Sequence, residues 1–599
     1  MKVFFSNYRL FFNFIFISLT IFNLGRLILA FKYNMNFDYM FFIYAIRMDI
    51  IVIFTFLLIP ILLHTLNFIK SARFLLAISL IIFIFLEITN YLFFEEFHTR
   101  LNYLFIEYLE YPIEIFKMIW ESYKIVIVGT ILFIYLFIKL YFKYTNKYIT
   151  YSKIIYKLLF LPIIIIILAL GIRSSLDSST PNQSFYSYSN SVIKNDITNN
   201  TIFSLLYAIY LKSHDKMPFF GKLDKQIDDK SLLHHQSTQY SKKDKVVLVI
   251  LESFGNSFVG SLNGTPTTPM FDKMAKDGLF LSNMYSSSNR SNRGIEAVLS
   301  SLFPVYGNTF LKLPKSQTHF WTIAKTMKKN GYKTVFLYGG DSKFDNMKGF
   351  ILNNGFDEVV DQFNFDKNIK RYTWGVSDEE LYKKGEEILN SSSKPIFLVI
   401  YTLSSHKPFD YPDNKIEYYK KYPIKSFANS IKYADYSLGN FYNKLINKNF
   451  FTNGVFAAVA DHNAHITGNH IIPVNEFRIP ALFIAKDLKA KEITNVTHQI
   501  DIAPTLLDIS GIDCDIPAMG VDLTKISKSR ALITHRSSFA YLKDDVFVLY
   551  QKNKKPTVYD KNYKVVDTNN TLVQEGLYYI YKTYDIYNKK LHKDNNEEY

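Results

Sequence analysis

The chain has 599 residues, a formal net charge of +16 and an aromatic content of 17%. This length exceeds what one ordinary hydrophobic core supports, so we expect at least two structural units. Basic charge combined with aromatic side chains is compatible with nucleic-acid binding, but the apolar stretches described next argue against a nucleic-acid partner. The single cysteine, Cys514, excludes an intramolecular disulfide.

Residues 1–171 are dominated by long apolar stretches. Each contains about 18 or more mostly apolar residues, which is enough to cross a bilayer as a helix. The five stretches are 10–31, 40–66, 73–94, 124–142 and 154–171. The first is too long and too aromatic for a secretory signal, and we interpret it as a retained anchor. The sequence therefore predicts an α-helical membrane domain with five transmembrane helices.

The charges between these stretches predict the orientation of the chain. Basic residues lie before the first stretch, between the second and third, and between the fourth and fifth. They are Lys2, Arg9, Lys70, Arg73, Lys143, Lys147 and Lys153. Basic loops usually stay in the cytoplasm, whereas the Glu-rich connection 95–123 would face outside. We therefore expect a multi-pass protein of the bacterial inner membrane, with everything after about residue 172 extracytoplasmic.

Beyond the apolar region the composition changes twice. Residues 172–244 are polar and predict a linker with one helical segment near 199–213. From 245 short apolar runs alternate with helical patterns. Strands are expected at 246–251, 334–338, 396–402, 455–460 and 480–485, and helices near 268–277, 294–301, 319–330, 377–390 and 427–447. This alternation predicts an α/β catalytic domain over 245–540 with a mostly parallel central sheet. Residues 541–599 are expected to form its C-terminal extension and a charged tail.

Two of the predicted strands run directly into residues that commonly bind metals. VVLVILESFG at 246–255 continues into Glu252, and VFAAVADHNAH at 455–465 continues into Asp461 and His462. In open α/β sheets the functional site forms beyond the carboxyl ends of the strands. Carboxylate and imidazole ligands together suit Mn²⁺, Mg²⁺ or Zn²⁺. We therefore expect these three side chains to surround one divalent metal ion.

A serine precedes a predicted helix in the segment NRSNRG. Ser291 lies where free backbone N–H groups and the positive end of the helix dipole would favour a phosphate. Arg293 could add charge-assisted hydrogen bonds to that phosphate. A serine hydroxyl that contacts a divalent metal can attack phosphorus. The alternative is that Ser291 only caps the helix.

Further candidates follow two other strands. His406 in SSHKPF could bind a phosphate oxygen or protonate a leaving alkoxide, or could be structural. Asp341 in YGGDSKFDN could contact substrate, or could serve only as a turn residue. His465 and His470 follow His462 closely, and we interpret both as loop residues.

The ordered set of motifs resembles a known superfamily. LESFG, TPMFDKMAKDG, NRSNRGIEA, YGGDSKFDN, HKPF, ADH and QIDIAPTLLDISG together look like the alkaline phosphatase–sulfatase superfamily. Within it the chain is most similar to phosphoglycerol transferases of the lipoteichoic acid synthase type, which also carry five membrane helices. The resemblance implies that Glu252, Ser291, Asp461 and His462 hold one divalent ion, commonly manganese. It also implies that Ser291 is the nucleophile and that His406 binds the substrate phosphate.

Three positions depart from the family pattern. The family nucleophile is commonly threonine, and here it is Ser291. NRSNRG lacks the proline of the sulfatase motif C/S-x-P-x-R, which argues against sulfate-ester hydrolysis. Where the family has a tryptophan and an arginine that contact glycerol phosphate, this chain has Phe344 and Asn346. The identity of the transferred headgroup is therefore not decided by these positions.

The sequence therefore predicts a membrane-bound transferase. It would move phosphoglycerol from a phospholipid donor, phosphatidylglycerol, to a hydroxyl of a glycan or polymer through a phosphodiester on Ser291. Arg293, Asp341 and His406 would bind the substrate. The alternatives are a phosphoethanolamine transferase acting on a glycan or lipid A, and a sulfatase-like hydrolase.

Overall fold

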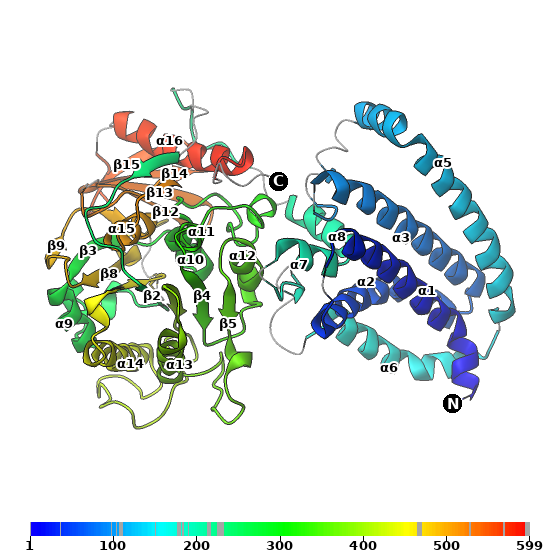
Figure 1. The fold of residues 1–599 in the computed structure, drawn as a ribbon, viewed down its shortest axis with the longest axis horizontal. Helices are drawn as coiled ribbons and strands as arrows, with labels where there is room; N and C mark the ends of the chain where they lie inside the picture. Colours follow the sequence, from blue (N-terminus) through cyan, green and yellow to red (C-terminus); the bar gives the residue numbers. More distant parts are fainter. Residues whose placement is uncertain are drawn as a thin grey trace. The chain divides into compact units, whose positions relative to one another are not determined.

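The structure is a computed structural model that forms two compact units, Met1–Ser213 and His214–Glu598. The two units are described separately, and Figure 1 shows the elements of each. The structure describes residues 2–35, 37–97, 99–102, 105–106, 112–149, 151–175, 181–182, 185–189, 191–212, 217–224, 233–463, 466, 470–525, 529–566 and 570–592.

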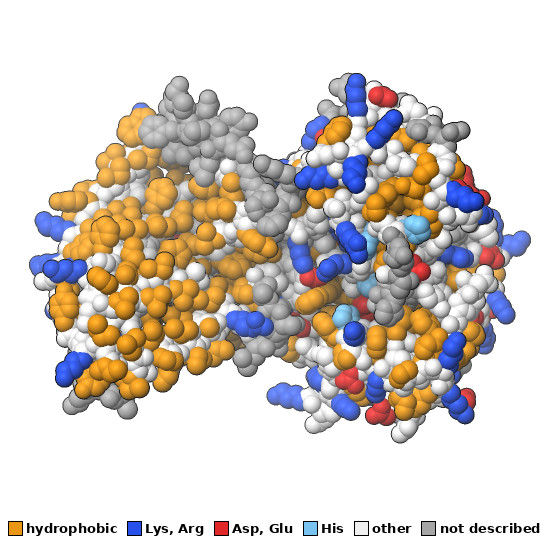
Figure 2. Space-filling view, turned by 180° about the vertical axis from the view of Figure 1, so that it is seen from behind, with side chains coloured by type: hydrophobic (Ala, Val, Ile, Leu, Met, Phe, Trp, Pro, Cys, Tyr) orange, Lys and Arg blue, Asp and Glu red, His pale blue; other side chains and the backbone are white. Residues whose placement is uncertain are grey.

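The first unit is entirely helical in its described residues. Its helices are α1 (Lys2–Lys32), α2 (Tyr39–Thr65), α3 (Ile69–Phe97), α5 (Pro112–Thr145), α6 (Ile154–Arg173), α7 (Val192–Thr198) and α8 (Thr201–Lys212). Among the described residues, five of them (α1, α2, α3, α5 and α6) are long and apolar enough to cross a membrane, which confirms the five predicted apolar helices. Figure 2 shows that hydrophobic side chains dominate the visible face of this unit, as expected for a surface in contact with lipid.

Charged residues inside the bundle pair with one another. Arg26 of α1 donates from Nη1 to Oδ2 of Asp49 of α2 at 2.7 Å, and both side chains are buried. Asn200 also donates to Asp49, at 2.8 Å. Arg47 instead donates to the Ser174 hydroxyl at 2.8 Å. A buried ion pair with additional hydrogen bonds avoids leaving a charge unpaired in an apolar environment, so this network ties the start of α8 to the bundle.

The segment predicted as a linker, 172–244, is divided between the two units. Its α7 and α8 pack against α1, α2 and α3 of the helical unit. The predicted helical segment near 199–213 corresponds to α8, Thr201–Lys212. Residues 103–104 and 107–111 of the Glu-rich connection lie outside the described residues.

A large mixed sheet forms the centre of the second unit. In the described residues its strand order is β10-β3-β8-β7-β2-β6-β4-β5, with β9 added beside β3. The strands are β2 (Lys245–Leu251), β3 (Leu279–Tyr285), β4 (Lys333–Tyr338), β5 (Glu358–Val360), β6 (Ile396–Tyr401), β7 (Gly454–Ala460), β8 (Arg478–Ala485), β9 (Lys491–Ile493) and β10 (Thr497–His498). Only β8 runs antiparallel to its neighbours in these described pairings, so the predicted mostly parallel α/β sheet is confirmed.

Helices cover this sheet, and smaller sheets lie beside it (Figure 1). The helices are α9 (Pro269–Asp277), α10 (Ser291–Ser300), α11 (Ile323–Lys329), α12 (Met347–Asn353), α13 (Asp378–Ser391), α14 (Phe427–Asn447), α15 (Ile502–Ile509) and α16 (Asn570–Asn588). The smaller strands are β1 (Leu233–Gln236), β11 (Cys514–Pro517), β12 (Ala531–His535), β13 (Ser538–Lys543), β14 (Val546–Gln551) and β15 (Thr557–Asp560). The predicted charged tail lies mostly outside the described residues, which end at 592.

The central strands explain why the site forms where it does. β2, β6 and β7 are continuous apolar runs in which nearly every side chain is buried, as expected for strands covered on both faces. In register, Leu251 of β2 pairs with Ala460 of β7, and Ile250 pairs with Tyr401 of β6. The three strands therefore end level with one another, and the residues that follow them meet at one edge of the sheet.

Candidate active site

Glu252 and Asp461 follow adjacent parallel strands, and backbone contacts hold them side by side. The Asp461 N–H donates to the Leu251 carbonyl at 3.1 Å, which continues the ladder between β2 and β7 by one step. The Ser253 N–H donates to Asp461 Oδ1 at 2.7 Å, and the His462 N–H donates to the same oxygen at 2.6 Å. Backbone N–H groups thus hold the Asp461 carboxylate in place.

Glu252, Asp461 and His462 form a buried cluster with the composition of a metal site. One ligand atom from each lies within 4.8 Å of the others. His462 Nε2 is 3.8 Å from Glu252 Oε1 and 3.5 Å from Asp461 Oδ2. Two carboxylates and one imidazole at these separations suit a small divalent cation.

The electrostatics of the cluster are compatible with a divalent cation. Burial and the nearby charge of Glu252 raise the pKa of Asp461 well above its usual range. Burial would also raise the pKa of Glu252, but the neighbouring His462 and His406 lower it below its usual value. Burial lowers the pKa of His462 and favours the neutral imidazole that binds metals. A bound divalent cation would stabilise the cluster with both carboxylates ionised.

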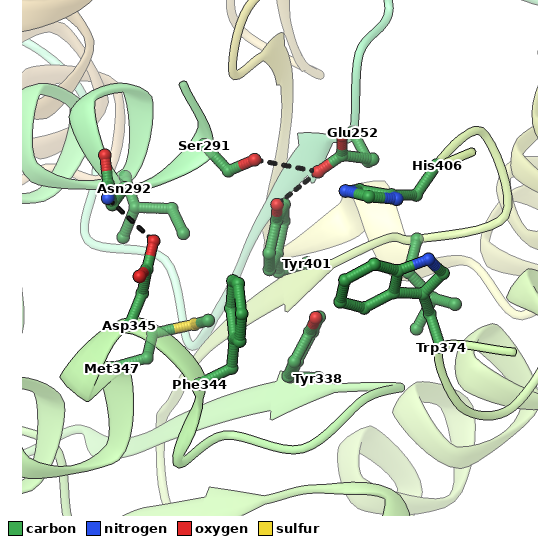
Figure 3. Close-up of a pocket in the computed structure, with 12 residues that line it drawn as sticks. Glu252, Ser291, Asn292, Tyr338, Phe344, Asp345, Met347, Trp374, Tyr401 and His406 are labelled. Atoms are coloured by element: carbon green, nitrogen blue, oxygen red, sulfur yellow. Dashed lines mark hydrogen bonds between the residues drawn. The ribbon is translucent and has the colours of Figure 1, made fainter. Parts of the chain in front are cut away.

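Ser291 is the first residue of α10, and its hydroxyl points toward this cluster. Its Oγ donates to Glu252 Oε2 at 3.2 Å (Figure 3). The same Oγ lies 3.1 Å from His462 Nε2. The N-cap position belongs to Arg290, one residue earlier. The geometry therefore favours a chemical role for Ser291 over helix capping.

Gly294 brings the start of α10 close to the strand ends. A Cβ at this position would overlap the carbonyl oxygen of Asp461 and lie 2.8 Å from the Asp461 Cα. The overlap would involve backbone atoms, which cannot rotate out of the way. The absence of a side chain in NRSNRG at this position is therefore required for Ser291 to reach Glu252 and His462.

His406 lies on the opposite side of the site, in the loop that follows β6. Its ring is 4.1 Å from that of Trp374, and its Nδ1 lies 2.9 Å from the Lys407 carbonyl oxygen. The loop is held by Asp378, whose Oδ1 accepts the N–H groups of Leu403 and Ser404 at 3.1 Å each. Asp378 therefore positions the loop that carries His406.

A small pocket opens in front of Ser291 and His406. Figure 3 shows aromatic and polar side chains from several elements around it. The pocket is lined by Glu252, Ser291, Asn292, Ile295, Tyr338, Phe344, Asp345, Met347, Trp374, Tyr401, Leu403 and His406. The rings of Tyr338 and Tyr401 stack at 5.0 Å, and the Tyr401 hydroxyl donates to both Glu252 and Asp461. The pocket therefore combines an aromatic wall with polar groups beside the Ser291 hydroxyl.

Two predicted substrate contacts are not seen at the pocket. Arg293 is buried, and its guanidinium donates to Glu296 and to the Gly307 carbonyl, each at 2.8 Å, because its side chain leaves α10 on the face directed into the protein. Asp341 accepts the Lys343 N–H at 3.0 Å within its turn. Neither is among the described residues that line the pocket.

The two histidines after His462 were interpreted as loop residues. His470 stacks on Tyr563 with ring centroids 3.7 Å apart, which agrees with a structural role. His465 lies outside the described residues.

Sequence reasoning missed several residues of the pocket. Tyr338 and Tyr401 are the last residues of β4 and β6, at the same sheet edge as Glu252, so their position near the ends of predicted strands could have identified them. Asp345 lies in the YGGDSKFDN motif, but Asp341 was the acidic residue selected there. Trp374 lies in a loop with no pattern of its own.

Comparison with known proteins identifies the family. Residues 244–512 match the family model described as Sulfatase. A solved structure of a protein in the alkaline phosphatase superfamily from Vibrio parahaemolyticus is 33% identical and has a TM-score of 0.59. The alignment covers 65% of this chain and 97% of that one. The chain belongs to the alkaline phosphatase superfamily. This confirms the superfamily resemblance seen in the motifs.

Other relatives carry lipoteichoic acid synthase names. Lipoteichoic acid synthase 2 of Bacillus subtilis (strain 168) is 23% identical, covering 45% of each chain. Lipoteichoic acid synthase of Staphylococcus aureus (strain USA300) is 23% identical over 58% of this chain and 59% of that protein. The chain thus spans about half the length of the curated relatives it matches. The structure of the lipoteichoic acid synthase LtaP from Listeria monocytogenes (TM-score 0.52, 22% identity, 59% of this chain and 94% of that chain) supports the fold.

The close approach at Gly294 yields a first prediction. We expect Gly294→Ala to destabilise the α/β unit by about 1–3 kcal/mol, because the added methyl group overpacks against the Asp461 backbone. Thermal unfolding of the purified chain measures this loss. Gly385→Ala is the matched control, because its Cβ would meet the flexible ends of side chains and no backbone, the nearest being Ile400 Cδ1 at 2.9 Å. Equal stability of the two variants would contradict the proposed constraint on α10.

Asp378 gives a prediction about pH. Burial raises its pKa from 3.8 to about 6. The unfolded chain therefore loses this proton at lower pH than the folded chain, and the free energy of unfolding falls as pH rises from about 4 to 6. Asp378→Asn removes this titration, so its stability relative to wild type should rise by up to about 3 kcal/mol between pH 4 and 7.

Melting temperatures measured across this pH range test the prediction. Asp357→Asn is the control of opposite sign: although burial alone would raise the pKa of Asp357, its hydrogen bond with Lys328 holds that pKa below the usual value. A pH-independent difference between Asp378→Asn and wild type would contradict the assignment.

Proposed function

We propose that the protein is a membrane-bound phosphoglycerol transferase. It moves the headgroup of phosphatidylglycerol to a hydroxyl of a glycan or polymer. The observation that carries the proposal is the Ser291 hydroxyl at the start of α10, within hydrogen-bonding distance of Glu252 and His462. The lipoteichoic acid synthase names of its curated relatives support this choice within the superfamily.

The same residues are suited to a divalent metal. Glu252, Asp461 and His462 would bind it together with the Ser291 hydroxyl. The ligand atoms of the first three lie within 4.8 Å of one another, and Ser291 Oγ is 3.2 Å from Glu252 Oε2. Manganese is the expected ion, with magnesium or zinc as alternatives. Such an ion, when bound, lowers the pKa of a coordinated hydroxyl and withdraws charge from a phosphoryl oxygen.

The residues of the chain have separate tasks in the transfer. Ser291 Oγ forms a bond to phosphorus while the bond from phosphorus to the diacylglycerol oxygen breaks, and the proton that Ser291 loses ends on that oxygen, so diacylglycerol leaves as the alcohol. His406 faces the pocket, where it can bind the phosphate or protonate the departing alkoxide. An acceptor hydroxyl then attacks phosphorus, and its proton returns to Ser291 as the Oγ–P bond breaks. Helix α10 directs its N-terminal N–H groups toward the same phosphate.

The helical unit fits a lipid donor. Five helices of sufficient length and apolarity would keep the α/β unit at the bilayer surface, where phosphatidylglycerol is available. We propose that the protein lies in the bacterial inner membrane with the α/β unit outside the cytoplasm. This orientation follows from the basic residues in the connections between the helices.

Intact mass of the full-length chain in detergent tests the nucleophile and the donor. After incubation with Mn²⁺ and phosphatidylglycerol we expect a gain of one glycerol phosphate, which Ser291→Ala abolishes. Ser300→Ala is the matched control, because this serine lies on the same helix and its hydroxyl donates to the Glu296 carbonyl, away from the cluster. An adduct that persists in Ser291→Ala would contradict the mechanism. An adduct that forms with phosphatidylethanolamine but not with phosphatidylglycerol would contradict the proposed donor lipid.

A further inference from the structure

Asp345 is a pocket residue to which the mechanism above gives no task. It lies in the turn between β4 and α12, and its carboxylate points toward the start of α10 (Figure 3). Oδ2 accepts a hydrogen bond from Asn292 Nδ2 at 2.7 Å, and Oδ1 pairs with the ammonium group of Lys312. Asn292 directly follows Ser291 in the chain. The carboxylate is therefore linked to the same turn of helix that carries the nucleophile.

The turn that carries Asp345 is held in an uncommon conformation. Asp345 and Asn346 both have left-handed backbone angles, with φ of 54° and 64°. Such angles are strained for a residue with a side chain, so they persist where the surroundings fix them. Here buried Asn346 donates to the Leu311 carbonyl at 2.6 Å and to Gln317 Oε1 at 2.8 Å. These bonds fasten the turn beside Lys312 and direct Asp345 into the pocket.

The charges around Asp345 favour a neutral hydroxylated ligand. The pair of Asp345 and Lys312 has no net charge, and the Asp345 carboxylate, which lines the pocket, offers acceptor oxygens to neighbouring hydroxyl groups. A cationic ammonium group would gain less, because Lys312 already neutralises the carboxylate. Phe344 and Trp374, with ring centroids 5.7 Å apart, add an apolar wall that suits the carbon chain of a small polyol.

We propose that Asp345, held by Lys312 and Asn292, binds the vicinal hydroxyl groups of the donor headgroup and selects glycerol over ethanolamine. This inference rests on the proposed function of the site. Phe344 and Asn346 occupy the positions where the family has its tryptophan and arginine, so the sequence alone did not identify the headgroup. In the structure Asn346 supports the turn, Phe344 lines the pocket, and Asp345 between them supplies the specificity.

Binding of soluble headgroups to the full-length chain in detergent tests the selection. With Mn²⁺ present, isothermal titration with glycerol phosphate and with phosphoethanolamine gives the preference of the wild-type protein, which we expect to favour glycerol phosphate. In Asp345→Ala the affinity for glycerol phosphate should fall about tenfold or more, because hydrogen bonds to a charged group are lost. The affinity for phosphoethanolamine should change little.

Lys312→Met provides a test of opposite sign. Without the lysine the Asp345 carboxylate is no longer neutralised, so phosphoethanolamine should bind more tightly and glycerol phosphate more weakly. A general loss of structure would weaken both ligands and could not produce this reversal. The matched control is the pair of Lys328 and Asp357, 2.7 Å apart, whose carboxylate is 24% exposed, as is that of Asp345. Lys328→Met and Asp357→Ala should leave the preference unchanged.

The outcomes separate this inference from the proposed function. An unchanged preference in both Asp345→Ala and Lys312→Met overturns the inference, as does a wild-type protein that binds neither headgroup. If the headgroup affinities shift as expected but no adduct forms on Ser291, the glycerol-binding role of Asp345 is supported and the transferase proposal is overturned.

Discussion

Burial of two carboxylates beside an imidazole is the constraint on which the rest of the site depends. Glu252 and Asp461 are 3% and 0% exposed, and an unpaired charge in such a position costs several kcal/mol. The protein offsets part of this cost with hydrogen bonds from the backbone N–H groups of Ser253 and His462 and from the Tyr401 hydroxyl. These groups orient the carboxylates but bring no full positive charge. The cluster is therefore organised for a cation, and the placement of Ser291, His406 and the pocket follows from it.

The side chains of the site are held by rigid parts of the fold. Parallel strands that end level with one another place Glu252 and Asp461, and a helix packed directly against the Asp461 backbone at Gly294 places Ser291. The loop that carries His406 is fastened by Asp378. Groups that are held in position before a substrate arrives need little reorganisation during reaction, which is the usual basis of efficient phosphoryl transfer.

The sequence predicted the strand ends well because buried parallel strands leave a clear apolar pattern. Glu252, Asp461 and His462 follow such runs, and the structure brings them together as expected. The antiparallel direction of β8 was not predicted from the sequence. Parallel neighbours are usually joined by a crossover helix, whereas the described residues of the 461–477 connection contain only the short turn Val474–Phe477. Side-chain direction on a helix was equally hidden, so Arg293 was assigned to the pocket although it pairs with Glu296. Asp345 was missed because its left-handed turn depends on contacts with Leu311 and Gln317, which are distant in the sequence.

The most direct test of the account is the metal content of the full-length chain. Equilibrium dialysis against Mn²⁺, followed by elemental analysis, should give one ion per chain for the wild type and none for Asp461→Asn. Asp435→Asn is the appropriate comparison, because Asp435 is also a buried aspartate but accepts the N–H groups of Met270 and Phe271 away from the cluster. This variant should retain the ion. Equal binding by Asp461→Asn and wild type, or no binding by wild type at saturating Mn²⁺, would contradict a site organised around a divalent cation.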